Sequence, residues 1–236
     1  MPRDAREVRL RHDLFRDGGT RIRVKVCCIA SVDEAAMALD AGADALGLVS
    51  AMPSGPGPIE ESEIAGVVEW VGDRADTVLL TSLQTAREIA GQDARLRPSV
   101  LQLVDSLTSE ALRELRTLAP SSAIMPVLHV PAGNALEEAL RVAPDCDAVL
   151  LDSGNPTAAV KELGGTGRIH DWNVSRTIVE RAGRPVFLAG GLSAANVASA
   201  INAVRPFGVD VCSGVRTNGM LDGAKVRAFV DAARNA

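Results

Sequence analysis

The sequence contains no tyrosine, and aromatic residues make up only 3% of its 236 positions. Its hydrophobic content is still 47%, so the expected core is built from aliphatic side chains, which suits buried parallel strands covered by helices. No run of about 18 apolar residues occurs, which excludes a conventional membrane-spanning helix. The charged first 20 residues lack the apolar stretch of a secretory signal. We therefore expect a cytoplasmic protein.

An excess of one charge sign is also missing, because the formal net charge is −5 and acidic and basic residues are interspersed. This pattern indicates neither a nucleic-acid partner nor a membrane surface. No CxxC motif or Cys/His cluster has the spacing of metal ligands, so we expect no metal site. Reduced thiols in a cytosolic protein are the simplest reading of the four cysteines, which are Cys27, Cys28, Cys146 and Cys212.

Short β-branched runs alternate with helical patterns from residue 22 onward. The predicted strands are Ile22–Ile29, Ala45–Val49, Thr77–Thr81, Val100–Leu103, Ile124–His129, Ala148–Asp152, Pro185–Ala189 and Val209–Cys212. The predicted helices are Ser31–Ala41, Glu60–Val71, Thr85–Ala90, Thr108–Leu118, Ala135–Val142, Asn173–Arg181, Ala194–Val204 and Asp222–Ala233. Eight such units favour a closed (β/α)₈ TIM barrel over an open doubly wound sheet. We predict one α/β barrel domain over residues 22–236, preceded by an N-terminal extension over residues 1–21.

Strand alternation assigns faces to the first and last strands. Lys25 and Cys27 share one face of the first strand, and the alternate residues, Cys28 among them, are expected to face the helices. Asp210 and Cys212 share a face of the last strand. Since these two strands become neighbours when the barrel closes, we expect Lys25 and Asp210 to form a buried pair inside it.

Glycine-bearing turns follow the last three strands: GGTG (Gly164–Gly167), AGGL (Ala189–Leu192) and CSGV (Cys212–Val215). Each alone is as well explained as a tight turn. Together they lie where TIM barrels bind phosphate with backbone amides and a helix start. The three turns predict a phosphate site.

Cys27 and Asp152 are expected at the ends of the first and sixth strands, on opposite sides of the barrel mouth. A thiol and a carboxyl there suit a proton shuttle, in which one group takes a proton from carbon and the other gives one to oxygen. Taken alone, a strand cysteine is more often a small buried hydrophobe. The strand-end aspartate is harder to explain structurally, because an unpaired buried carboxylate is costly.

Several segments resemble the phosphoribosylanthranilate isomerase family, in the right order and from about residue 22 to the end of the chain. They are RVKVCCIASVDEAAMALDAGADALGLV (Arg23–Val49), LLDS (Leu150–Ser153), GGTGRIHDW (Gly164–Trp172), LAGGLSAANVASAI (Leu188–Ile201) and VRPFGVDVCSGV (Val204–Val215). The family has a ribulose-phosphate-binding type of TIM barrel. It performs an Amadori rearrangement in tryptophan biosynthesis.

The resemblance implies roles for particular residues. Cys27 matches the general base that removes the C2′ proton, and Asp152 matches the general acid that protonates the furanose oxygen. Asp210 matches an aspartate near the family's site, with pairing to Lys25 as the equal alternative. Lys25 is also one source of the positive potential that a thiol base needs. The implied phosphate-binding residues are Gly165, Gly190, Gly191, Ser213 and Gly214. No metal or organic cofactor is implied.

The chain departs from the family in the half of the pocket that binds anthranilate. The second βα loop, Met52–Ile59, has no arginine where the family uses one to contact the anthranilate carboxylate. Cys28 stands where the family has glycine. His129 ends the fifth predicted strand, where the family generally has no histidine. It could recognise a carboxylate or another ring substituent, or be a hydrogen-bonded structural residue.

Three functions stay open at this point. The first is an intramolecular aldose–ketose isomerase with phosphoribosylanthranilate as its substrate. The second is the same chemistry on another phosphosugar conjugate, which the missing loop arginine favours. The third is a phosphate-ligand-binding barrel without turnover, which the presence of both Cys27 and Asp152 argues against. In each case the partner is a small phosphorylated sugar. The sequence leaves both a monomer and a homodimer open.

Overall fold

The computed structural model describes residues 14–15, 21–53, 55–130, 133–154 and 171–236. Eight parallel strands within them close into a barrel, in which β8 pairs with β1. Closure confirms the predicted (β/α)₈ barrel and excludes the open sheet. The strands are β1 (Arg23–Val26), β2 (Ala45–Val49), β3 (Asp76–Thr81), β4 (Val100–Leu103), β5 (Ala123–His129), β6 (Val149–Asp152), β7 (Val186–Leu188) and β8 (Gly208–Val211).

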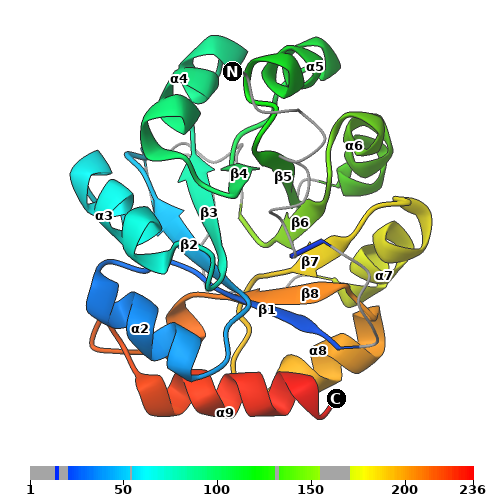
Figure 1. The fold of residues 1–236 in the computed structure, drawn as a ribbon. Helices are drawn as coiled ribbons and strands as arrows, with labels where there is room; N and C mark the ends of the chain where they lie inside the picture. Colours follow the sequence, from blue (N-terminus) through cyan, green and yellow to red (C-terminus); the bar gives the residue numbers. More distant parts are fainter. Residues whose placement is uncertain (1–13, 16–20, 54, 131–132, 155–170) are drawn as a thin grey trace.

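A ring of helices surrounds the strands, as Figure 1 shows. They are α2 (Val32–Asp40), α3 (Glu61–Val71), α4 (Ala86–Leu96), α5 (Ser109–Leu118), α6 (Ala135–Val142), α7 (Trp172–Arg181), α8 (Val197–Val204) and α9 (Gly223–Arg234). Each follows one strand, so the chain is a regular βα repeat. Within the described part of the chain, no helix combines the length and apolar character needed to span a membrane.

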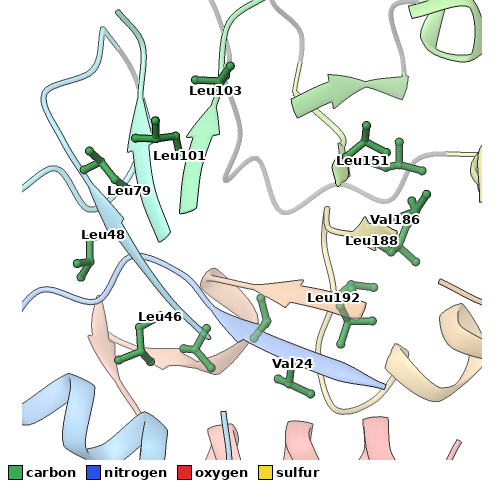
Figure 2. Packing of buried hydrophobic residues seen from close by; sticks show 14 of the residues in the cluster. Val24, Leu46, Leu48, Leu79, Leu101, Leu103, Leu151, Val186, Leu188 and Leu192 are labelled. Atoms are coloured by element: carbon green, nitrogen blue, oxygen red, sulfur yellow. The ribbon is translucent and has the colours of Figure 1, made fainter. Parts of the chain in front are cut away.

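Two apolar layers hold the barrel together. The larger lies between the strands and the helices, where alternate strand residues such as Leu46, Leu79 and Leu101 are fully buried. Figure 2 shows several of these side chains projecting from the outer faces of the strands. The smaller layer fills the barrel interior with the other alternate residues. Strand alternation therefore decides which residues pack against the helices and which face the interior of the barrel.

Helix starts follow from capping residues that the sequence shows. Ser31 accepts a hydrogen bond from the Glu34 amide, and Thr108 accepts one from the Ala111 amide. The predicted helix at Thr85–Ala90 was too short, because α4 continues past Gly91 to Leu96. Its later turns bury side chains against the barrel, and that tertiary packing outweighs the poor helix propensity of one glycine.

The N-terminal end of the barrel is closed by residues that precede β1. Leu14 is only 2% exposed, and its amide donates to the Asp76 carboxylate at 2.9 Å. The Phe15 ring meets Phe187 of β7 edge to face, with 6.0 Å between centroids, and Phe187 lies 5.8 Å from Phe207. This part of the chain therefore plugs the barrel floor.

Candidate active site

A pocket opens at the carboxyl ends of the strands. Each strand is shifted by one residue relative to its neighbour, as in other barrels of this shear, so the inward residues of alternate strands lie on three levels. The floor has Gly47, Gln102, Leu150 and Asp210; the middle has Cys27, Leu80, Val127 and Ala189; the rim has Val49, Val104, Asp152 and Cys212. Most of the walls are apolar, so only the few polar groups can hydrogen-bond to a ligand or exchange protons with it.

Lys25 and Asp210 form the predicted pair beneath the pocket. Lys25 is completely buried, and its Nζ donates to Asp210 Oδ1 at 2.8 Å. Burial alone would lower the pKa of Lys25, but the negative charges of Asp210 and of the Cys27 thiolate raise it above its usual value. A Cβ at Gly47 would lie 2.8 Å from Cys27 Sγ and 3.0 Å from Lys25 Nζ. Glycine at position 47 thus leaves the space that these two side chains occupy.

The pKa of the Cys27 thiol is lowered from its usual value. The largest cause is a hydrogen bond from the Cys28 thiol, and the nearby Lys25 charge acts in the same direction against the effect of burial. Cys27 is buried and lines the pocket from the end of β1. The setting therefore favours a thiolate at the pocket wall.

The prediction that Cys28 faces the helices was wrong. Strand β1 ends at Val26, three residues before the predicted end at Ile29, and Cys28 adopts a φ of +64°. This left-handed conformation turns the chain so that Cys28 lines the pocket beside Cys27, with its Sγ 2.7 Å from Cys212 Sγ. Cys27, Cys28 and Cys212 therefore gather on one wall, a cluster that the sequence spacing did not indicate.

Asp152 lies at the rim, at the end of β6, and is 6% exposed. Burial raises the pKa of its carboxyl, although the Ser153 amide and His129 partly oppose this. The Gly154 amide donates to Asp152 Oδ2 at 3.2 Å. A carboxyl that stays protonated to a higher pH than usual is suited to give a proton to a ligand.

His129 pairs with Asp152 in the register of β5 and β6. Its Nε2 lies 3.2 Å from the Val104 carbonyl, which requires a proton on Nε2, and its buried Nδ1 has no partner within the described residues. His129 is thus partly held by the backbone, as the structural reading expected. It is not among the residues that line the pocket.

Two backbone turns meet beside the pocket. Gly190 and Gly191, after β7, have φ values of +88° and +63°, and both line the pocket together with Ser213 after β8. Asn196 fixes the first turn by accepting from the Ser193 amide and donating to the Gly191 carbonyl. Gly214 does not line the pocket, and a Cβ there would lie 2.0 Å from the Leu192 carbonyl oxygen, so its glycine is required by packing.

One predicted phosphate residue, Gly165, lies outside the described residues, as does the rest of the GGTG turn. The strand and turn patterns did not single out Gln102, although it is the one polar residue in the otherwise apolar strand Val100–Leu103. Among the described residues, no three His, Cys, Asp or Glu side chains are grouped so that they could hold a metal ion.

Comparison with known proteins places this geometry in a family. Residues 24–232 match the family model described as N-(5′-phosphoribosyl)anthranilate isomerase. The chain is 36% identical to N-(5′-phosphoribosyl)anthranilate isomerase 2 of Methanosarcina mazei, across 91% of this chain and 95% of that protein. It is 37% identical to the N-(5′-phosphoribosyl)anthranilate isomerase of Haloferax volcanii, across 91% and 94%.

Solved structures agree. The phosphoribosylanthranilate isomerase of Thermotoga maritima superposes with a TM-score of 0.75 at 27% identity, covering 91% of this chain and 100% of that one. A structure of such an isomerase in complex with reduced 1-(o-carboxyphenylamino)-1-deoxyribulose 5-phosphate superposes with a TM-score of 0.72 at 25% identity, with the same coverage.

Proposed function

The chain belongs to the phosphoribosylanthranilate isomerase family, and on that premise we propose that it is an aldose–ketose isomerase of tryptophan biosynthesis. Its substrate would be N-(5′-phosphoribosyl)anthranilate, and its product the corresponding 1-amino-1-deoxyribulose 5-phosphate. The observation that carries the proposal is that Cys27 and Asp152 line one pocket, with pKa values shifted in the directions that a base and an acid need.

Ring opening is the task proposed for Asp152. Its protonated carboxyl gives a proton to the furanose oxygen, the bond between that oxygen and C1′ breaks, and the nitrogen lone pair forms a C=N bond to C1′. The raised pKa of Asp152 keeps the acid form available, and the Gly154 amide stabilises the carboxylate that is left.

Proton transfer from carbon is the task proposed for Cys27. Its thiolate takes the proton from C2′, and the electron pair of that C–H bond moves to give an enolamine. The Cys27 thiol then gives a proton to C1′ and the Asp152 carboxylate takes the C2′ hydroxyl proton, which gives the ketone and returns both residues to their starting charge. The Lys25 charge beneath Cys27 supports the thiolate.

We assign phosphate binding to backbone amides at Gly190, Gly191 and Ser213, which line the pocket. For Gly165 and Gly214 the same assignment rests on the family resemblance alone. Glycine there lets the main chain approach an anion closely. We also assign residues 22–236 to the catalytic barrel and residues 1–21 to an extension before it. Leu14 and Phe15 support a structural role for the extension at the opposite end of the barrel.

The direct test is turnover of N-(5′-phosphoribosyl)anthranilate by the purified chain, measured as the rate at which the substrate disappears. Cys27→Ala and Asp152→Asn should each lower kcat by about 10²- to 10⁴-fold, because each removes one proton-transfer group. Cys146→Ala is the matched control, since Cys146 is equally buried but packs outside the barrel. Absence of turnover by the unaltered chain contradicts the function, and normal turnover in either site variant contradicts the assigned role.

One observation favours a second candidate, the same rearrangement on a conjugate without a carboxylate. None of the described residues that line the pocket is cationic. An arylamine carboxylate desolvated there without a charged partner would bind poorly. N-(5′-phosphoribosyl)aniline distinguishes the candidates: a kcat/KM within about tenfold of that for the anthranilate compound favours the second candidate, because a lost charge-assisted contact is worth about that much or more.

A further inference from the structure

Gln102 is a polar side chain in an apolar part of the pocket. It lies on β4, is 3% exposed, and faces the pocket floor between strand partners Leu80 and Met125. Its amide oxygen, Oε1, is buried and has no hydrogen-bond partner within the described residues. A buried acceptor without a partner is unfavourable, so a folded protein rarely keeps one that has no other use.

Gln92 is a second glutamine with an unpartnered side-chain oxygen, but a structural hydrogen bond explains why it is there. Its Oε1 is also buried without a partner among the described residues, but its Nε2 donates to Glu61 at 3.0 Å on the outer surface of the barrel. That hydrogen bond accounts for the glutamine. Gln102 differs because it lines the cavity that also contains Cys27 and Asp152.

The place of Gln102 in the barrel selects the part of the ligand that reaches it. In the closed order of strands, β4 lies opposite β8, and the proposed phosphate turns follow β7 and β8. A phosphate held there directs the C5′ end of the sugar to one side of the pocket. The C1′ end and its nitrogen then extend toward β4, past Cys27 on β1.

We propose that Oε1 of Gln102 accepts a hydrogen bond from the substrate N–H at C1′, and that this bond strengthens when the nitrogen becomes positively charged on ring opening. The inference rests on the proposed function and adds a third catalytic group to it. A neutral amide suits this place, because a second carboxylate on the floor, beside that of Asp210, would further oppose ionisation of the Cys27 thiol, while an amide oxygen still stabilises the cation.

The test compares Gln102→Leu with the unaltered chain. Removing the acceptor should lower kcat by roughly 10- to 100-fold, the range for a hydrogen bond to a charged group, with a smaller change in KM. The melting temperature should stay the same or rise, because an unpartnered buried oxygen is replaced by an apolar side chain. Gln102→Glu, which keeps an acceptor, should bind the substrate nitrogen but raise the apparent pKa of the Cys27 limb in the pH profile.

Gln92→Leu is the matched control, since it removes the other unpartnered glutamine oxygen and should leave kcat unchanged. Turnover of Gln102→Leu within about twofold of the unaltered chain overturns the proposal. So does an activity loss that a fall in the melting temperature of Gln102→Leu accounts for, because the variant would then act through the fold.

Binding of reduced 1-(o-carboxyphenylamino)-1-deoxyribulose 5-phosphate separates this proposal from the proposed function. That compound has a neutral amine N–H, so calorimetry should show binding weakened by only about 2- to 10-fold in Gln102→Leu. If the unaltered chain binds the compound without turning over substrate, the function fails while the role of Gln102 is still measured. Equal binding by both proteins overturns the role of Gln102.

Discussion

The two ends of the barrel differ in whether their buried polar groups find hydrogen-bond partners within the chain. At the N-terminal end, the Asp76 carboxylate accepts the Leu14 amide, and Phe15 packs on the Phe187 ring. At the carboxyl end, Gln102 Oε1 has no partner among the described residues, and Asp152 accepts the Gly154 amide while burial raises the pKa of its carboxyl. The chain satisfies the first end by itself, whereas the second end leaves groups available for a ligand.

The largest loss of stability is expected when the Lys25–Asp210 pair is disrupted, because this buried ion pair lies beneath the pocket and supports it. Lys25→Met leaves a buried carboxylate without its partner, so the free energy of unfolding should fall by about 3–5 kcal/mol. Denaturant unfolding of the purified protein measures this.

A double variant serves as its control. Lys25→Met with Asp210→Leu removes both charges and should recover most of the stability, while turnover stays low because the Cys27 thiolate has lost the nearby cation. Full activity in the double variant would contradict any role of Lys25 beyond holding the fold.

The opposite end should show the reverse pattern. Leu14→Ala removes a side chain that is 2% exposed, and the free energy of unfolding should fall by about 2–3 kcal/mol. Because Leu14 lies at the N-terminal end of the barrel, away from the pocket, kcat and KM at a temperature where the protein is folded should not change. A changed kcat at full folding would show that the plug and the site are coupled.

The smallest expected effect is a shift in pH dependence. Cys27 acts as a base only as the thiolate, and its lowered pKa extends that form to lower pH; Asp152 acts only when protonated, and its raised pKa extends that form to higher pH. The two limbs of the kcat/KM profile should therefore lie closer together than an ordinary aspartate and cysteine would place them.

Cys28 sharpens this test because its thiol is the largest cause of the lowered pKa at Cys27. Cys28→Gly fits the φ of +64° and removes the donor, so the pH midpoint for inactivation by iodoacetamide should rise. Cys28→Ser keeps a donor and should leave the midpoint near that of the unaltered chain. An unchanged midpoint in Cys28→Gly would contradict the hydrogen bond from Cys28.

Strand and helix patterns in the sequence predicted the barrel, the inward faces of Lys25, Cys27 and Asp210, and the glycine-bearing turns that follow β7 and β8. These succeed because buried parallel strands alternate faces with a period of two, and closure makes the first strand a neighbour of the last. Alternation failed at Cys28, since it assumed a strand that continues beyond Val26. It also gave no reason to select Gln102, because nothing local to a strand shows whether an inward amide finds a partner.

The order and spacing of residues alone thus determined the fold and the facing of the barrel's own side chains. Only the tertiary structure decided which polar groups are satisfied, which thiols gather at Cys27, and what closes the barrel floor. The physical reason is that alternation is a property of each strand, whereas hydrogen-bond partners and pKa shifts arise between residues that lie far apart in the chain, such as Lys25 and Asp210.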